Sequence, residues 1–153
     1  MPIAIPMFGD FLKRLTAPAP APLIDADARL ALGALLVRVA KSDNHFAGQE
    51  VDIIEHLLAK RYGLSPADAS ELRVQCEELE REAPDTVRFT RAIKGAVALE
   101  DRIAVIQDLW AVVLADGVRD VHENTLLRLI ANLLGVTDVE SAKARQKVQA
   151  GLD

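Results

Sequence analysis

The spacing of apolar residues is the feature that most constrains how this 153-residue chain can fold. From Leu23 onward, apolar side chains recur at intervals of three and four residues, as they do along the buried face of a helix. No stretch sustains the strict alternation of a half-buried strand, and half of all residues are apolar, which is enough to build a core. We therefore predict an all-α fold, a bundle of about seven helices in residues 23–153.

Residues that typically begin or end helices divide this stretch into segments. Ser65 followed by Pro66 predicts a helix start, and Pro84 predicts the end of the same helix. Gly63 and Gly135 suit the left-handed position that follows the last turn of a helix. The expected helices cover about residues 25–41, 48–62, 66–82, 85–93, 100–115, 120–134 and 137–151.

Residues 1–22 form a separate segment before this predicted domain. Within it, Met7–Leu15 can form a short amphipathic helix, and residues 16–22 are rich in alternating Ala and Pro, which is typical of an extended polyproline II spacer. In one interpretation, the segment folds back onto the body of the protein or frays. In the other, it is a small, weak anchor for a partner protein or a membrane surface.

Charge and cysteine content limit the classes of function. The net charge of −5 does not favour a general affinity for nucleic acid or anionic lipid, because both are polyanions. The single cysteine, Cys76, can form neither an internal disulfide nor a four-thiolate zinc site within one chain. No stretch is apolar enough for a transmembrane span, and residues 1–15 lack the pattern of a secretory signal. We therefore expect a soluble, cytoplasmic protein.

The chain contains an internal repeat. Asp43 and Asp116 each follow an apolar helix, and a glutamate comes seven residues after each of them, Glu50 in the first case and Glu123 in the second. Each glutamate opens a predicted helix that ends at a glycine followed by an apolar residue and Ser or Thr. We interpret the sequence as two related helix–acidic turn–helix units.

These repeated residues resemble the TerB-like family, whose pattern is a helix ending in Ala-Asp-Gly, a short turn, and a Glu that opens the next helix. The second copy, with Ala-Asp-Gly at residues 115–117 followed by Glu123, matches this pattern well, whereas in the first copy Asn44 replaces the glycine. The resemblance covers about residues 25–151. It implies an all-helical bundle of bacterial origin with no settled activity, a link to tellurite and chemical-stress responses, and a proposed metal site formed by acidic residues.

The acidic residues of the two turns are the candidate site: Asp43, Glu50, Asp116, Asp120 and Glu123. Their carboxylates are hard oxygen donors, which suit Ca²⁺, Mg²⁺ or Mn²⁺ when enough of them converge. Two alternatives stay open. The same residues can simply cap helices and interact with helix dipoles, or they can form an acidic patch that binds a protein partner.

Other residue patterns do not suggest a catalytic site. His45, His56 and His122 lack the spacing of a metalloprotease or di-iron motif, and we expect them to face solvent or bond locally. Cys76 is expected to be a small, semi-buried residue and not a nucleophile. The basic residues are expected on a solvated face: Arg38, Lys41, Lys60, Arg61, Arg88, Arg91 and Lys94.

Together with the resemblance to the TerB-like family, the sequence predicts a non-enzymatic interaction module that binds a protein partner and serves a stress response or an assembly at the inner membrane. Its acidic turns would engage a divalent cation or a basic partner surface. One alternative is a metal-dependent hydrolase or metal carrier that uses the same carboxylates. Another is a structural homo-oligomer in which exposed apolar residues of the last helix form an interface.

Overall fold

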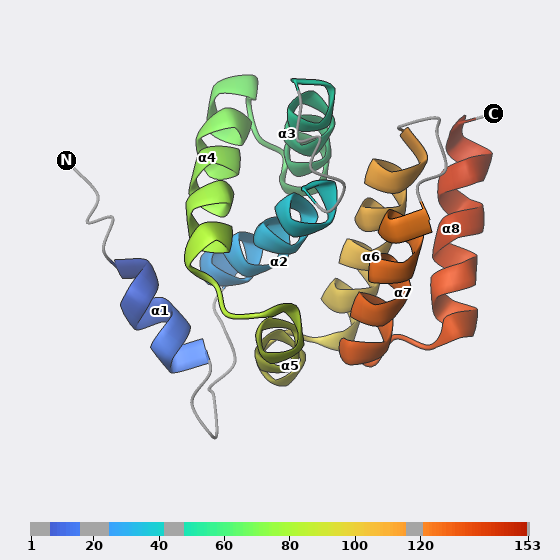
Figure 1. The fold of residues 1–153 in the computed structure, drawn as a ribbon. Helices are drawn as coiled ribbons and strands as arrows, with labels where there is room; N and C mark the ends of the chain where they lie inside the picture. Colours follow the sequence, from blue (N-terminus) through green and yellow to red (C-terminus); the bar gives the residue numbers. More distant parts are fainter. Residues whose placement is uncertain (1–6, 16–24, 42–47, 116–120, 153) are drawn as a thin grey trace.

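The computed structural model describes residues 7–15, 25–41, 48–115 and 121–152. Eight α-helices lie in these ranges (Figure 1): α1 (Met7–Leu15), α2 (Asp25–Ala40), α3 (Gly48–Tyr62), α4 (Pro66–Glu82), α5 (Thr86–Ala96), α6 (Leu99–Ala115), α7 (Val121–Leu133) and α8 (Asp138–Leu152). They are the seven helices expected after residue 23 and the short helix of the N-terminal segment. No strand occurs in the same ranges, so the predicted all-α fold is confirmed.

The central helix of the bundle is α2. Every residue from Ala31 to Ala40 is buried except Arg38, so this part of α2 has no wide polar face. A helix that is apolar on all sides needs neighbours on all sides. Accordingly, α2 packs against α3 and α4, which follow it in the chain, and against α6 and α7. Even so, no helix in the described ranges combines the length and apolarity that crossing a bilayer requires.

Three helix starts are formed by the side chains that the sequence predicts. Before α4, Ser65 Oγ accepts a hydrogen bond of 3.1 Å from the backbone N–H of Asp68. Asp85 caps α5 in the same way with its own carboxylate. Before α8, Thr137 Oγ1 accepts from the N–H of Glu140 at 3.1 Å, and Glu140 Oε1 accepts from the N–H of Thr137 at 2.9 Å. This reciprocal pair is a capping box.

The two helices that follow the acidic turns end in the same way. Gly63 after α3 and Gly135 after α7 have φ angles of 64° and 74°, in the left-handed region that glycine adopts without strain. The N–H of the residue after each glycine donates to the carbonyl five residues earlier, at 3.0 and 2.9 Å. These hydrogen bonds are typical of a Schellman motif. The shared ending is consistent with the predicted repeat.

Helices α2 and α4 approach each other closely at Gly33 on α2 and Cys76 on α4. A Cβ atom added at Gly33 would lie only 2.3 Å from Cys76 Sγ, so this contact requires the absence of a side chain. Cys76 is 0% exposed. The expectation that this cysteine is only semi-buried was therefore wrong, because α4 turns it directly into the α2 interface.

The N-terminal helix packs on the body of the protein. Phe11 and Leu15 are buried in the main hydrophobic core, and α1 contacts α4 and α5. These two side chains belong to the apolar face that a membrane or partner anchor would need. Their burial supports the interpretation in which the segment folds back. The predicted Ala-Pro spacer, residues 16–22, lies outside the described residues.

Candidate functional site

The acidic residues predicted from the repeat lie mostly outside the part of the chain that the structure describes. Asp43, Asp116 and Asp120 fall in undescribed ranges, and Glu123 lies in the first turn of α7 without a described side chain. Among the described residues, no three His, Cys, Asp or Glu side chains form a group that could hold a metal ion. Convergence of the two acidic turns therefore stays a prediction.

Glu50 is the one predicted ligand whose side chain is described. It lies in the first turn of α3, where a carboxylate interacts favourably with the partial positive charge of the helix N-terminus. The residue is only 8% exposed. Burying a carboxylate costs free energy, so such low exposure is unusual for a glutamate. His45 and His122 lie near the acidic turns in the sequence, and the structure does not describe their side chains.

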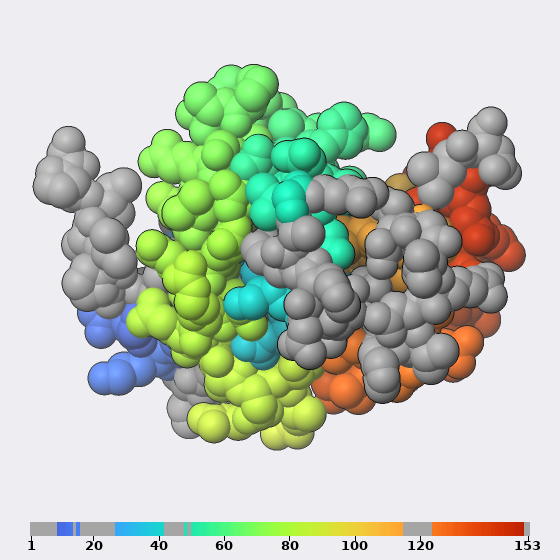
Figure 2. All heavy atoms as spheres, turned by 45° about the horizontal axis from the view of Figure 1, so that its top comes forward, coloured from blue at the N-terminus to red at the C-terminus, as the bar shows by residue number. Residues whose placement is uncertain are grey.

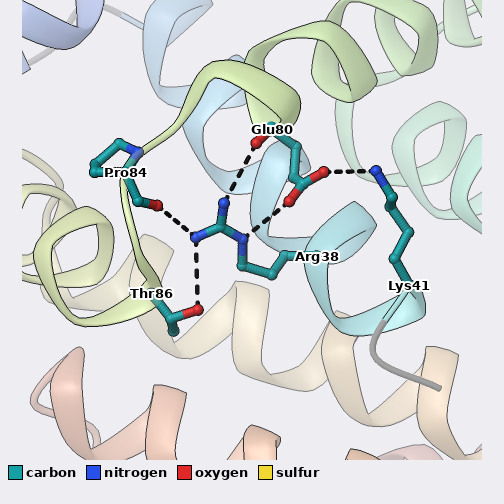
Figure 3. A network of polar contacts seen from close by, with 5 residues as sticks. All are labelled: Arg38, Lys41, Glu80, Pro84 and Thr86. Atoms are coloured by element: carbon teal, nitrogen blue, oxygen red, sulfur yellow. Dashed lines mark hydrogen bonds and ion pairs between the residues drawn. The ribbon is translucent and has the colours of Figure 1, made fainter. Parts of the chain in front are cut away.

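A polar network joins α2, α4 and the start of α5 (Figure 3). Arg38 Nε donates to Glu80 Oε2 at 3.0 Å, and Lys41 Nζ donates to Glu80 Oε1 at 2.8 Å. The guanidinium also donates to the carbonyl of Pro84 at 2.8 Å and to the carbonyl of Glu80 at 3.3 Å. Thr86 Oγ1 lies 3.5 Å from the same group. The network thus fixes the turn between α4 and α5 against α2.

Burial and hydrogen bonding compete at Glu80. Burial alone would raise the pKa of this carboxyl, but the hydrogen bonds from Lys41 and Arg38, together with their charges, lower it below its ordinary value. The side chain of Arg38 is 14% exposed. The expectation that Arg38 belongs to a solvated face was therefore wrong, because the arginine reaches inward to satisfy backbone carbonyls.

A second ion pair connects α3 with α6. Arg61 Nε and Nη2 donate to the two oxygens of Asp108 at 2.5 and 2.7 Å, and Nη2 also donates to the carbonyl of Ala104 at 3.2 Å. Arg61 thus binds Asp108 in a bidentate arrangement, which is the strongest geometry for an arginine–carboxylate pair. Hydrogen bonding to Asp108 raises the pKa of Arg61. Asp108 is 7% exposed, although it belongs to a helix that is otherwise largely apolar.

Two hollows meet at Arg61. One, of about 290 Å³, lies between α2, α3 and α6 and includes Arg29, Tyr62 and Asp101 in its wall. The other, of about 590 Å³, lies between α3, α6 and α8. Arg29 stacks over the ring of Tyr62 at 4.5 Å, and burial raises the pKa of the Tyr62 phenol to about 12. The phenol therefore stays protonated at neutral pH.

The single thiol does not have the properties of a nucleophile. Burial raises the pKa of Cys76 to about 12, so the thiolate that would react is scarcely populated at neutral pH. The prediction that Cys76 is not a nucleophile agrees with this environment. His56 is exposed on α3, as expected for a solvent-facing histidine.

These features define a class of protein, an all-α bundle in which α3, α4, α6 and α7 pack around the apolar helix α2. Residues 29–146 match the family model described as "Tellurite resistance protein TerB", and this range includes both copies of the repeat. The match covers most of the chain, and the protein belongs to the TerB family. A search of curated proteins and a search of solved structures each found no significant match.

Sequence reasoning missed the Arg61–Asp108 pair. The two residues are 47 positions apart, and no local pattern connects them. One signal was present in the sequence. Asp108 is a lone carboxylate among the apolar positions of α6, and a charged residue on such a face needs a partner from another helix.

Proposed function

We propose that this TerB-family protein is a binding module of a tellurite-related stress response, and that its two acidic turns together bind a divalent cation. The observation that carries the proposal is the repeated Asp-x₆-Glu spacing, at Asp43–Glu50 and at Asp116–Glu123. Both copies lie within the family match. The link to tellurite rests on the description of the family.

The donor set indicates which ions the turns would take. All five proposed ligands, including Asp120, are carboxylates, and oxygen ligands of this kind suit Ca²⁺, Mg²⁺ or Mn²⁺ better than softer metals. The buried position of Glu50 supports the proposal, because a carboxylate held at a helix start is already oriented before an ion arrives. A binding role also fits the described residues, where the only thiol is buried and protonated.

Thermal unfolding of chelator-treated protein tests the cation. A ligand that binds only the folded state at a hundredfold excess over its Kd raises the free energy of unfolding by about 2.7 kcal/mol. For a domain of this size, the expected rise in Tm is several degrees. Ca²⁺, Mg²⁺, Mn²⁺ and Zn²⁺ should be compared at millimolar concentration, and one of the first three is expected to give the rise.

Variants distinguish a site in the turns from a general ion effect. Asp116→Asn and Asp43→Asn should each abolish the rise, whereas Asp52→Asn, which neutralises an exposed carboxylate on α3, should preserve it. If no ion raises the Tm of the unaltered protein, the cation proposal is wrong and the turns act as helix caps or as an acidic protein-binding patch. Ion-dependent hydrolysis of p-nitrophenyl phosphate, lost in Asp116→Asn, would favour the metal-dependent hydrolase instead.

A further inference from the structure

The larger hollow forms a groove between two helices that are distant in sequence. Residues of α3 line one wall, residues of α8 line the other, and α6 forms the floor. In Figure 2, α3 lies near the centre of the view and α8 at its right side. The groove volume of about 590 Å³ falls within the range of about 300–1,000 Å³ that is usual for ligand clefts.

The charge of this groove is opposite to that of the protein. Lys60, Arg61 and Lys147 are basic residues and His56 lies beside them, whereas Asp108 is the only carboxylate among the described residues of the lining. Both oxygens of Asp108 are hydrogen-bonded to Arg61. The net charge of the whole chain is −5, so a basic groove does not follow from its composition. The groove therefore favours an anionic ligand.

The two lysines lie on opposite walls and are available for a ligand. Lys60 is exposed on α3 and Lys147 is exposed on α8, and neither forms an ion pair with any residue in the described ranges. Between them, Arg61 is held in place by its two hydrogen bonds to Asp108 and one to the carbonyl of Ala104. An extended anionic ligand could contact both lysines while it passes over a fixed guanidinium.

Apolar surface lies among these charges. Leu57 on α3, Ala111 on α6 and Val148 on α8 line the same groove, and each is only partly buried. A simple inorganic anion would leave this surface in water, whereas a ligand with both carboxylates and apolar groups would cover it. Among the described residues, the lining contains no Phe, Tyr or Trp on which nucleic-acid bases could stack.

We propose that the groove between α3 and α8 binds an acidic peptide segment of a partner protein, with the carboxylates of the peptide on Lys60 and Lys147 and its apolar side chains on Leu57 and Val148. The residues of this groove are different from those of the acidic turns, and their charge has the opposite sign. The protein would thus have a basic groove for one partner in addition to its proposed cation site.

Fluorescence anisotropy with a labelled synthetic peptide tests the groove. The probe is a ten-residue peptide that combines glutamate pairs with leucine pairs, and its Kd is measured against the full chain at low salt. The double variant Lys60→Glu/Lys147→Glu should weaken binding by about tenfold or more, because opposing charges would now repel the probe. Lys60→Gln/Lys147→Gln should give a smaller loss. Higher salt should weaken binding to the unaltered protein.

Matched controls separate the groove from general charge effects. Arg91→Glu/Lys143→Glu makes the same change in net charge at two exposed positions outside the groove, and it should leave the Kd unchanged. A probe with glutamine in place of glutamate should bind at least tenfold more weakly, and so should a probe with serine in place of leucine. Tm measurements on each variant show that the fold is retained.

Several results would overturn the proposal. The proposal is wrong if the acidic probe shows no measurable binding at millimolar protein. It is also wrong if the groove variant and its control lose the same amount of affinity for the probe. Tighter binding of a labelled ten-nucleotide RNA, lost in Lys60→Glu/Lys147→Glu, would identify a nucleic-acid site instead. If inorganic phosphate displaces the probe and itself binds with a micromolar Kd, the groove is a site for small anions and the peptide proposal is wrong. Asp116→Asn should not affect probe binding, so failure of the cation proposal leaves this one intact.

Discussion

Two arginines, one on α2 and one on α3, show how similar ion pairs can have different roles. Arg38 pairs with Glu80 of α4, and Arg61 pairs with Asp108 of α6, so each connects two helices. The side chain of Arg38 is 14% exposed, whereas that of Arg61 is 30% exposed. Arg38 also reaches the carbonyl of Pro84, where the chain turns between α4 and α5. Arg61 instead lines two hollows at the surface.

The surroundings of an ion pair decide whether it mainly stabilises the fold or remains accessible to a ligand. Arg38 is surrounded by protein acceptors, and it stacks over the ring of Phe89 at 5.5 Å, so little of its side chain is accessible to a ligand. Arg61 has protein acceptors on one edge of its guanidinium, and its residue borders solvent. We therefore expect loss of Arg38 to affect mainly stability, and loss of Arg61 to affect stability less.

The largest effect is expected for Arg38→Met. This change removes the ion pair to Glu80 and leaves the carbonyl of Pro84 without its donor, while Lys41 still contacts the carboxylate. Loss of one partner of a buried pair costs about 3–5 kcal/mol, and because Lys41 still pairs with Glu80, the expected loss in the free energy of unfolding is about 3 kcal/mol. Urea unfolding measures it. Arg91→Met, an exposed control on α5, should change stability by less than about 0.5 kcal/mol.

A smaller effect is expected for Arg61→Met. The variant leaves Asp108, which is only 7% exposed, without its bidentate partner, but the two hollows at Arg61 admit water that can replace part of the lost interaction. The expected loss in the free energy of unfolding is about 2 kcal/mol, measured by the same urea titration. If Arg61→Met costs as much as Arg38→Met, the distinction between the two ion pairs is wrong.

The sequence predicted the helices well because their boundaries depend on local chemistry. Ser65, Asp85 and Thr137 cap the helices that follow them, and Gly63 and Gly135 end two others, all by contacts within a few residues. Such contacts do not depend on the rest of the fold. The apolar spacing in turn predicted an all-α bundle, and it identified α1 as a short amphipathic helix.

Contacts between distant helices were not predictable in the same way. The partner of Arg38 is 42 residues away and that of Arg61 is 47 residues away, and periodicity does not indicate which helices meet. For this reason Arg38 was wrongly assigned to a solvated face, and the complete burial of Cys76 was missed. The groove between α3 and α8 was not predictable for the same reason, because tertiary packing of both helices against α6 forms it.

The smallest effect, and the most specific test of the Arg38 network, is the pH dependence of Glu80→Gln. The pKa of Glu80 is lowered in the folded protein, so its charged form adds stability above the ordinary pKa of a glutamate, and this contribution is lost as the pH falls through the folded value. The unaltered protein should therefore exceed Glu80→Gln in stability at pH 6, and the difference should shrink toward pH 3. Glu71→Gln, an exposed control on the same helix, should show no such trend. A difference that stays constant from pH 6 to pH 3 would mean that the charge of Glu80 does not hold α2 and α4 together, and that Arg38 acts mainly through the backbone carbonyls.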